Sequence, residues 1–179
     1  MAASNRLSTA GMSLMYAVET TAGNRPTEGY TRVPEVKSIP SFNDAPATLQ
    51  TTTLLETEYH TNIPGLKDAG GAKEFGANLT QELITAWNTV MTKYDAAVKD
   101  GKRMWWAVVH PKLDDAVYFA GVPSPLGQNE ASVDAVLETT LYITNETAFE
   151  RQPKPTDLAT MRSSADTPIA VKASKNNLD

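Results

Sequence analysis

Two histidines are the residues in this chain best suited to bind a metal ion or to move a proton. His60 lies in a threonine-rich stretch, and His110 directly precedes Pro111. The chain has no cysteine, so it offers neither a three-histidine nor a thiolate zinc site, and disulfides are excluded. A site of two histidines and one carboxylate remains open. We favour ordinary surface or interface histidines, and we expect no metal and no cofactor.

A glycine-rich stretch at residues 65–73 is superficially similar to a phosphate-binding loop. Such a loop needs Lys and then Ser or Thr to reach phosphate and magnesium, and this chain has Gly71 and Ala72 at those positions. Backbone N–H groups alone do not make a nucleotide site. We interpret the stretch as a contact loop.

The pair Glu56 and Glu58 is a candidate for acid–base chemistry. Residues two apart on a strand share a face, and paired carboxylates act as acid and base when burial separates their pKa values. Their neighbours Thr57 and Tyr59 are polar, which favours a solvated acidic face. The chain also lacks a Gly-x-Ser-x-Gly elbow and a dinucleotide-binding glycine motif, so we expect no enzyme.

Trp105 and Trp106 are candidates for base stacking or for a protein interface. Adjacent residues of a strand face opposite ways, so the sequence predicts at most one of these rings in the core. The other ring, or Phe119, can anchor an interface. Nucleic-acid stacking needs basic surroundings, whereas residues 1–150 carry a net charge of −7 and residues 151–179 one of +2. We therefore expect no docked nucleic acid.

Size and composition indicate one domain with extended arms. The chain has 179 residues, of which 41% are hydrophobic. Its apolar runs are too short to cross a bilayer, and residues 1–10 lack the apolar stretch of a signal peptide. We expect no membrane insertion and no secretion, and the lack of cysteine fits a reducing cytoplasm.

One helix is predicted at about residues 80–99. Asn78 or Thr80 can cap its start, and Gly101 ends it. A single apolar stripe indicates that the helix lies on a sheet. The stripe consists of Leu79, Leu83, Trp87, Val90, Met91, Tyr94 and Val98.

Strands are predicted on both sides of this helix. The proline-containing stretch 31–46 reads as an edge strand or an extended connection. The long strand 132–144 is expected to bury Val133, Leu137 and Leu141 on one face. Further strands are predicted at 47–62, 73–79, 103–109 and 116–122.

The fold class that follows is mostly β (α+β), a two-sheet β-sandwich or barrel with one flanking helix and extended arms. We divide the chain into an N-terminal arm at 1–30, a β-sandwich domain at 31–150 and a C-terminal arm or tail at 151–179. The arm contains a short strand that needs a partner sheet. The tail is rich in proline and lacks aromatic residues.

Several blocks in order along residues 8–150 carry a resemblance. They are Tyr16-Ala17-Val18-Glu19-Thr20, Ile39-Pro40-Ser41, Thr57-Glu58-Tyr59, Ile63-Pro64-Gly65-Leu66-Lys67-Asp68 with Gly70-Gly71, Thr85-Ala86-Trp87, Gly121-Val122-Pro123-Ser124 and Leu141-Tyr142-Ile143-Thr144. Together they resemble the major tail tube proteins of long-tailed, non-contractile bacteriophages. Residues 151–179 lie outside this resemblance.

The resemblance implies a structural virion protein. Six copies would form a ring, the inner sheets would merge into a barrel, and stacked rings would make the tail tube through which DNA is ejected. The implied partners are further copies, the tape measure protein, the tail tip and tail terminator proteins, and phage DNA in transit without sequence-specific binding. The chain would lie in the virion tail, and in the host cytoplasm during assembly.

Two alternatives stay open. The inner tubes of contractile tails and of secretion-type injection machines share this fold. A monomeric β domain that binds a ligand is the other alternative.

Two sets of site residues follow from the tube hypothesis. The lumen-lining candidates are Glu56, Glu58, Asp134 and Glu138. The inter-ring contact candidates are Leu14, Tyr16, Val18, Gly65, Leu66, Lys67, Asp68, Gly70 and Gly71.

Overall fold

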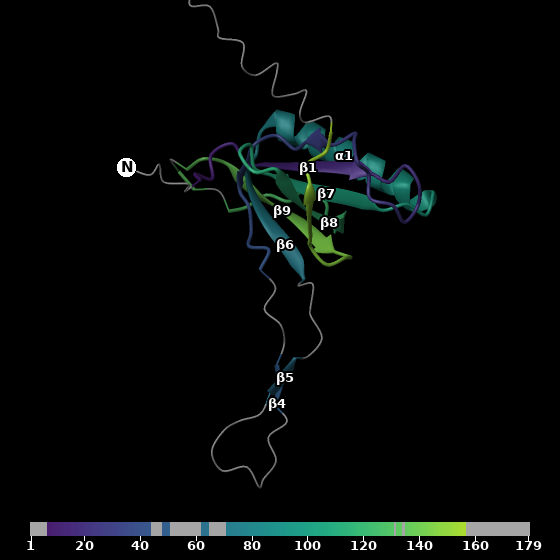
Figure 1. Ribbon diagram of the computed structural model, residues 1–179. Helices are drawn as coiled ribbons and strands as arrows, with labels where there is room; N and C mark the ends of the chain where they lie inside the picture. Colours follow the sequence, from purple (N-terminus) through teal and green to yellow (C-terminus); the bar gives the residue numbers. More distant parts are fainter. Residues whose placement is uncertain are drawn as a thin grey trace, which may run out of the picture.

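The computed structural model describes residues 7–43, 48–50, 62–64, 71–130, 132–133 and 135–156 (Figure 1). Its helix is α1 (Gln81–Lys99). Its strands are β1 (Ser13–Val18), β2 (Thr31–Arg32), β3 (Val36–Ser38), β4 (Thr48–Gln50), β5 (Asn62–Pro64), β6 (Ala72–Asn78), β7 (Met104–Val109), β8 (Asp115–Pro123), β9 (Glu138–Asn145) and β10 (Glu150–Pro153).

Eight of these strands form one curled antiparallel sheet. The order is β2-β1-β7-β8-β9-β6-β3, and β10 pairs with β8 beside β9. α1 packs against β1 and β8 (Figure 1). The predicted mostly-β fold with a single flanking helix is confirmed.

The sheet changes direction along β8. Residues 116–120 of this strand pair with β7, and residues 121–123 pair with β9. At the change, a Cβ on Gly121 would lie 2.8 Å from the carbonyl oxygen of Thr144 and 2.9 Å from Cγ2 of Ile143. The indole N–H of Trp106 donates a hydrogen bond to the Gly121 carbonyl at 3.0 Å. Only glycine allows β9 to approach β8 this closely.

The stretch 31–38 joins the two ends of the curled sheet. β2 pairs with β1, and β3, only four residues later, pairs with β6 at the other end of the strand order. Between them Val33 is buried in the core, and Glu35 has a φ of 61°, in the left-handed region. The prediction of an edge strand with proline breaks is therefore confirmed, and these breaks let one stretch serve two strands.

The main core lies inside the curl, under α1. Trp87 of the helix packs on Trp106 with ring centroids 5.9 Å apart and donates its indole N–H to the Ser124 carbonyl. All four phenylalanines of the chain meet at one end of this core, where Phe42 lies over Phe119 and Phe149. The buried members are Leu14, Tyr16, Val33, Phe75, Ala77, Leu83, Trp87, Val90, Met104, Trp106, Val108, Phe119, Leu141 and Ile143.

The helix begins as the sequence predicts. The Thr80 hydroxyl accepts a hydrogen bond from the Leu83 N–H at 3.2 Å, and Gly101 has the positive φ of 67° that suits the residue after a helix. The inward face contains Leu83, Trp87 and Val90. The end of the predicted stripe differs, because Val98 is 53% exposed and Ala97 is buried instead.

A second apolar layer covers the other face of β1, β7 and β8. The loop at residues 19–30 folds over this face, where Tyr30 meets Tyr118 edge-on at 5.7 Å and the Arg25 guanidinium lies 4.1 Å from the Tyr118 ring centroid. Trp105 is 6% exposed beneath the loop, and Trp106 is fully buried on the opposite side. The prediction that at most one of the two tryptophans lies in the core is wrong, because both faces of β7 are covered.

Glu19 fastens this loop to the sheet. Its carboxylate accepts hydrogen bonds from the indole N–H of Trp105 at 2.9 Å and from the backbone N–H groups of Gly23 and Arg103 at 2.9 and 3.1 Å. Burial raises the pKa of the Glu19 carboxyl, but these hydrogen bonds and the Arg103 charge together outweigh burial and leave that pKa below its ordinary value.

Two predicted boundaries need correction. β1 is a central strand between β2 and β7, not part of an arm that seeks a partner sheet in another copy. The long strand predicted from residue 132 begins only at Glu138, and Val133 and Leu137 are exposed instead of buried. A hydrogen bond from the Ala135 N–H to the Ser132 carbonyl turns the chain before β9.

We expect Gly121→Ala to destabilise the fold by about 1–3 kcal/mol, since the added methyl group forces β9 away from β8. Urea unfolding measures this loss. Gly127→Ala is the control, because a Cβ there meets no atom within 4 Å and its free energy of unfolding should hardly change. Equal stability of the two variants would contradict a close approach at Gly121.

We expect Glu19→Gln to lower the free energy of unfolding by about 1–3 kcal/mol at neutral pH. The side-chain amide has only one oxygen, so its NH₂ group would face an N–H donor that the carboxylate accepts from. The pKa of the Glu19 carboxyl is lowered in the folded state. The carboxylate therefore contributes to the free energy of unfolding at pH values above the ordinary pKa range of a glutamate. This contribution is lost as pH falls through the folded-state pKa. Unfolding measured between neutral and acidic pH should show the gap to wild type closing in acid.

The control for this variant is Glu28→Gln, an exposed glutamate on the same loop, which should unfold like wild type at neutral pH. A gap for Glu19→Gln that stays constant down to strongly acidic pH would contradict the role given to the carboxylate charge.

Candidate assembly surfaces

Of the two candidate histidines, His110 falls among the described residues. No group of three or more His, Asp or Glu residues that could hold an ion occurs there. His110 is buried, its Nδ1 accepts from the Lys112 N–H at 3.2 Å, and its Nε2 lies 2.7 Å from the Ser8 carbonyl oxygen, to which it must donate. Both ring nitrogens are thus occupied by backbone groups. His60 lies outside the described residues.

Among the described residues, the helix is too polar to cross a membrane.

A groove of about 980 Å³ opens between residues 36–43, residues 9–12 and the start of β10. Met12, Phe42 and Val117 line its apolar part, and Asp115 and Arg151 lie among its polar lining. The groove is therefore a gap between strand edges over the core.

The outward face of β6 and β9 is polar. Cross-strand neighbours on this face include Glu74 with Tyr142 and Asn78 with Glu138. On the inward face the same strands contribute Phe75 and other core residues. This alternation is typical of an antiparallel sheet with one solvated face.

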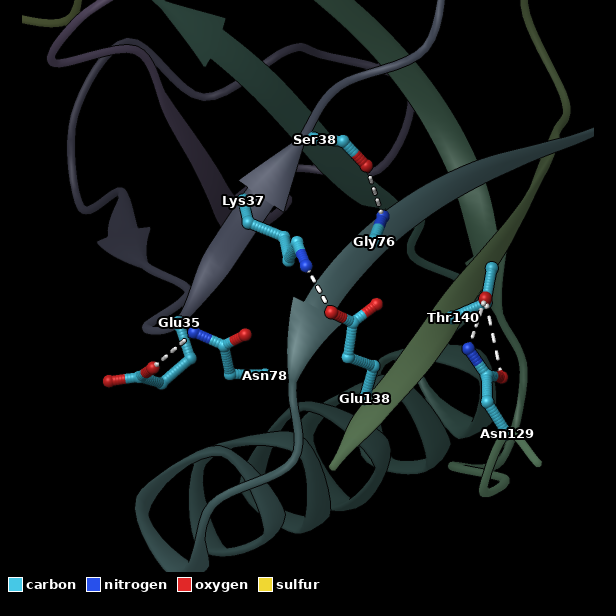
Figure 2. A network of polar contacts seen from close by, with 8 residues as sticks. All are labelled: Glu35, Lys37, Ser38, Gly76, Asn78, Asn129, Glu138 and Thr140. Carbon is cyan, nitrogen blue, oxygen red and sulfur yellow. Dashed lines mark hydrogen bonds and ion pairs between the residues drawn. The ribbon is translucent and has the colours of Figure 1, made fainter. Parts of the chain in front are cut away.

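Side chains on this polar face attach the terminal strand β3 to the sheet (Figure 2). Lys37 forms an ion pair with Glu138 two strands away. The Ser38 hydroxyl accepts from the Gly76 N–H at 3.0 Å, and the Asn78 amide donates to the Glu35 carboxylate at 3.3 Å. These side-chain contacts add to the backbone pairing of β3 with β6.

The same face continues beyond β9. The side-chain amide of Asn129 lies 3.3 Å from the Thr140 hydroxyl (Figure 2). It ties the connection between β8 and β9 to the sheet.

Of the lumen-lining candidates, only Glu138 falls among the described residues. It lies on the polar face, half exposed, with Lys37 as its partner. Its negative charge is therefore offset by a lysine that the sequence analysis did not assign to this face. Glu74 is exposed on the same face and forms no ion pair with another described residue. Glu56, Glu58 and Asp134 lie outside the described residues.

The inter-ring candidates in β1 need correction. Leu14 and Tyr16 are buried in the chain's own core, and Val18 packs against that core, because β7 supplies the partner strand. Gly71 is exposed just before β6. The remaining candidates, Gly65, Leu66, Lys67, Asp68 and Gly70, lie outside the described residues.

β2 offers an unpaired backbone edge. The Val33 N–H donates to the Leu14 carbonyl at 2.9 Å, so Val33 faces β1. Backbone groups alternate along an antiparallel strand, and the N–H and C=O of Arg32 therefore point away from β1. Because β2 is a terminal strand of the described sheet, this edge can accept another strand.

β4 and β5 form a sheet of their own. Their register pairs Thr48 with Pro64, Leu49 with Ile63 and Gln50 with Asn62, and neither strand pairs with the larger sheet. An isolated two-stranded ladder is marginally stable in water, so this one gains from a partner.

A further surface is absent from the sequence prediction. Three large apolar side chains are exposed just before β9, with Val133 at 92%, Val136 at 70% and Leu137 at 42% exposure. The sequence did not reveal this surface, because apolar residues at alternate positions, such as Val133 and Leu137, are also typical of a buried strand. The turn-forming residues Pro125 and Gly127 upstream were the available hint.

We expect Gly76→Ala to loosen β3, because the new methyl group would collide with the Ser38 hydroxyl and displace its hydrogen bond. Loss of this hydrogen bond should lower the free energy of unfolding by about 1 kcal/mol. Hydrogen exchange of the β3 amides should rise, while Gly71→Ala, with nothing within 4 Å, should leave it unchanged. Unaltered exchange in Gly76→Ala would contradict the attachment described here.

The sequence matches no protein-family model and no curated protein sequence. Similarity is found among solved structures. A chain in the six-fold symmetrised baseplate of the anti-feeding prophage has a TM-score of 0.58 and 8% identity, covering 84% of this chain and 98% of that one.

Two further chains give lower scores. One, from the tail of an empty GTA particle refined with C6 symmetry, has a TM-score of 0.49 and 10% identity, covering 79% of this chain and 95% of its own. The other, from the SPP1 tail tube, has a TM-score of 0.48 and 11% identity, covering 94% of this chain and 87% of that one. The protein thus shares the fold of the chain from the anti-feeding prophage baseplate.

Proposed function

We propose that this protein is a tail tube subunit whose copies assemble into stacked rings. The observation that carries the proposal is the fold shared with the baseplate chain of the anti-feeding prophage over nearly all of that chain. The sequence blocks that resemble phage tail tube proteins support it independently. The protein is then a structural component of a virion tail and not an enzyme.

The terminal strands support ring formation. β2 and β3 end the described sheet, and the outward backbone groups of Arg32 are available to a neighbour. Strand addition between copies would join adjacent sheets and remove the exposed edges. Six copies per ring is the number that the six-fold baseplate and the family resemblance favour.

The polar face of β6 and β9 is the wall that we assign to the lumen. It carries Glu74, Glu138 and Tyr142, and the ion pair with Lys37 reduces its net charge. Repulsion between exposed charges is about 1 kcal/mol at ~4 Å in water, and salt screens it over ~10 Å. Such a wall lets DNA pass without binding it. The candidates Glu56, Glu58 and Asp134 would add to it.

The proposal implies partners beyond further copies. A tape measure protein would fill the tube during assembly in the host cytoplasm, and tail tip and tail terminator proteins would close its ends. The inner tube of a contractile or secretion-type machine is the alternative, since the shared fold is compatible with both.

Arg32→Pro tests ring formation. Proline removes the outward N–H of β2 without removing a bond to β1, and the extended Thr31 before it tolerates proline. Wild-type protein should form rings or tubes visible by negative-stain electron microscopy. The variant should remain a folded monomer by sizing and circular dichroism.

Arg32→Thr is the matched control, because it also removes the positive charge but keeps the N–H. It should assemble like wild type. Assembly of Arg32→Pro would refute pairing through this edge, and wild-type protein that stays monomeric at every concentration would refute the proposed function itself.

A further inference from the structure

A pocket of about 300 Å³ lies where the last turns of α1 meet the end of β1. Ala17 of β1 and Ala97 of α1, which are both buried, give it an apolar wall. Lys93 and Lys102 also line the pocket, against one acidic residue, Asp100. The pocket therefore combines an apolar wall with a net positive charge, on a body whose residues 1–150 carry a net charge of −7.

The Tyr16 side chain lines the same pocket, and its hydroxyl is unsatisfied. The residue is only 4% exposed, yet its hydroxyl forms no hydrogen bond with another described residue. The oxygen atom is not sealed inside the core either. The pocket is therefore the place where this hydroxyl can meet a ligand.

Tyr16 differs in this respect from the other buried aromatic residues that carry a polar atom. The hydroxyl groups of Tyr30 and Tyr118 donate to backbone carbonyls, and the indole N–H groups of all three tryptophans have acceptors. Buried tyrosines and tryptophans ordinarily have such partners. The exception at Tyr16 coincides with a pocket that carries positive charge.

The two lysines have no competing partner in the described part of the chain. Neither Lys93 nor Lys102 forms an ion pair there, with Asp100 or with any other acidic residue. Lys93 Nζ lies 5.2 Å from the Tyr16 ring centroid, so its ammonium group is held near that ring. The last carbonyls of α1 accept from the backbone N–H groups of residues 100–102 and do not need the lysines.

We infer that this pocket binds a carboxylate group attached to an apolar body. A carboxylate oxygen accepts hydrogen bonds both from the Tyr16 hydroxyl and from lysine ammonium groups, and such charge-assisted bonds are stronger than neutral ones. Asp100 and the negative end of the α1 dipole favour a single negative charge over a phosphate dianion. An apolar wall with a few polar groups is typical of ligand pockets.

The carboxylate has two chemical sources. One is a small molecule, and the other is an Asp or Glu side chain of a second copy of this acidic chain. The binding chemistry is the same for both, and it does not depend on the proposed function.

Saturation-transfer NMR with benzoate tests the pocket, because the method detects a bound ligand on single chains and on large assemblies alike. Benzyl alcohol is the uncharged probe of nearly the same shape. Benzoate should bind unassembled wild-type protein in a saturable way, and benzyl alcohol should bind about tenfold more weakly or less. Absence of benzoate binding, or equal binding of the two probes, would overturn the inference.

Two variants assign the binding to this pocket. Tyr16→Phe removes the hydroxyl and keeps the buried ring, and Lys102→Met removes the charge of a partly exposed side chain. Each should weaken benzoate binding about tenfold or more while the circular dichroism spectrum stays that of wild type. Lys99→Met is the matched control, an exposed lysine of α1 outside the lining, and should bind like wild type.

Wild-type affinity in either folded variant would contradict the inference, and Lys102→Met decides alone if Tyr16→Phe does not fold.

The same probe on assembled protein distinguishes the two sources. If a side chain of a neighbouring copy fills the pocket, benzoate should bind single chains but not tubes, and it should slow assembly. If the ligand is a small molecule, benzoate should bind both forms equally. If no tubes form, the proposed function fails, whereas benzoate binding to single chains still decides this inference.

Discussion

The fold depends on one strand, β8, which belongs to both halves of the curled sheet. β8 pairs with β7 through its first part and with β9 through its last three residues, and Gly121 stands where the pairing changes. The Trp106 indole holds the Gly121 carbonyl from inside the core. Without this bend the sheet would stay open, and the inward faces of β1 and β6 could not enclose the same apolar cluster under the helix.

The bend also divides the molecule into two kinds of surface. Around β7 both faces are buried, one by the main core and one by the loop that Glu19 fastens. Around β6 and β9 only the inward face is buried, and the outward face is polar. The first region is therefore buried on both sides, and the second presents a polar face on which Lys37 offsets the charge of Glu138.

Local patterns predicted local structure well, and distant pairings limited the rest. The helix follows from its apolar period and its Thr80 cap. β1 was misplaced because its pairing with β7 joins residues such as Leu14 and Val108, which are far apart in sequence. The burial of Trp105 depends on a loop that folds back, and no periodicity records this. Residues 132–137 have the composition of a strand, but a turn competes with pairing there. Of the candidate surfaces, the proline-rich edge was predicted from the sequence. The ion pair of Lys37 and the exposure of the valines before β9 were found only in the structure.

The exposed edges are short, and this bears on how such a chain can assemble without aggregating. β2 has two residues and β3 has three, so strand addition at either edge forms few hydrogen bonds. Burial of a Val or Leu side chain contributes about 1.5–3 kcal/mol, whereas association costs roughly 4–15 kcal/mol in lost freedom of motion. No single contact of this kind holds two copies together. In a ring stack each copy would satisfy lateral edges and axial contacts at once, so assembly becomes favourable only when several contacts form together. If the protein assembles as proposed, weak separate surfaces would keep free subunits apart and make polymerisation cooperative.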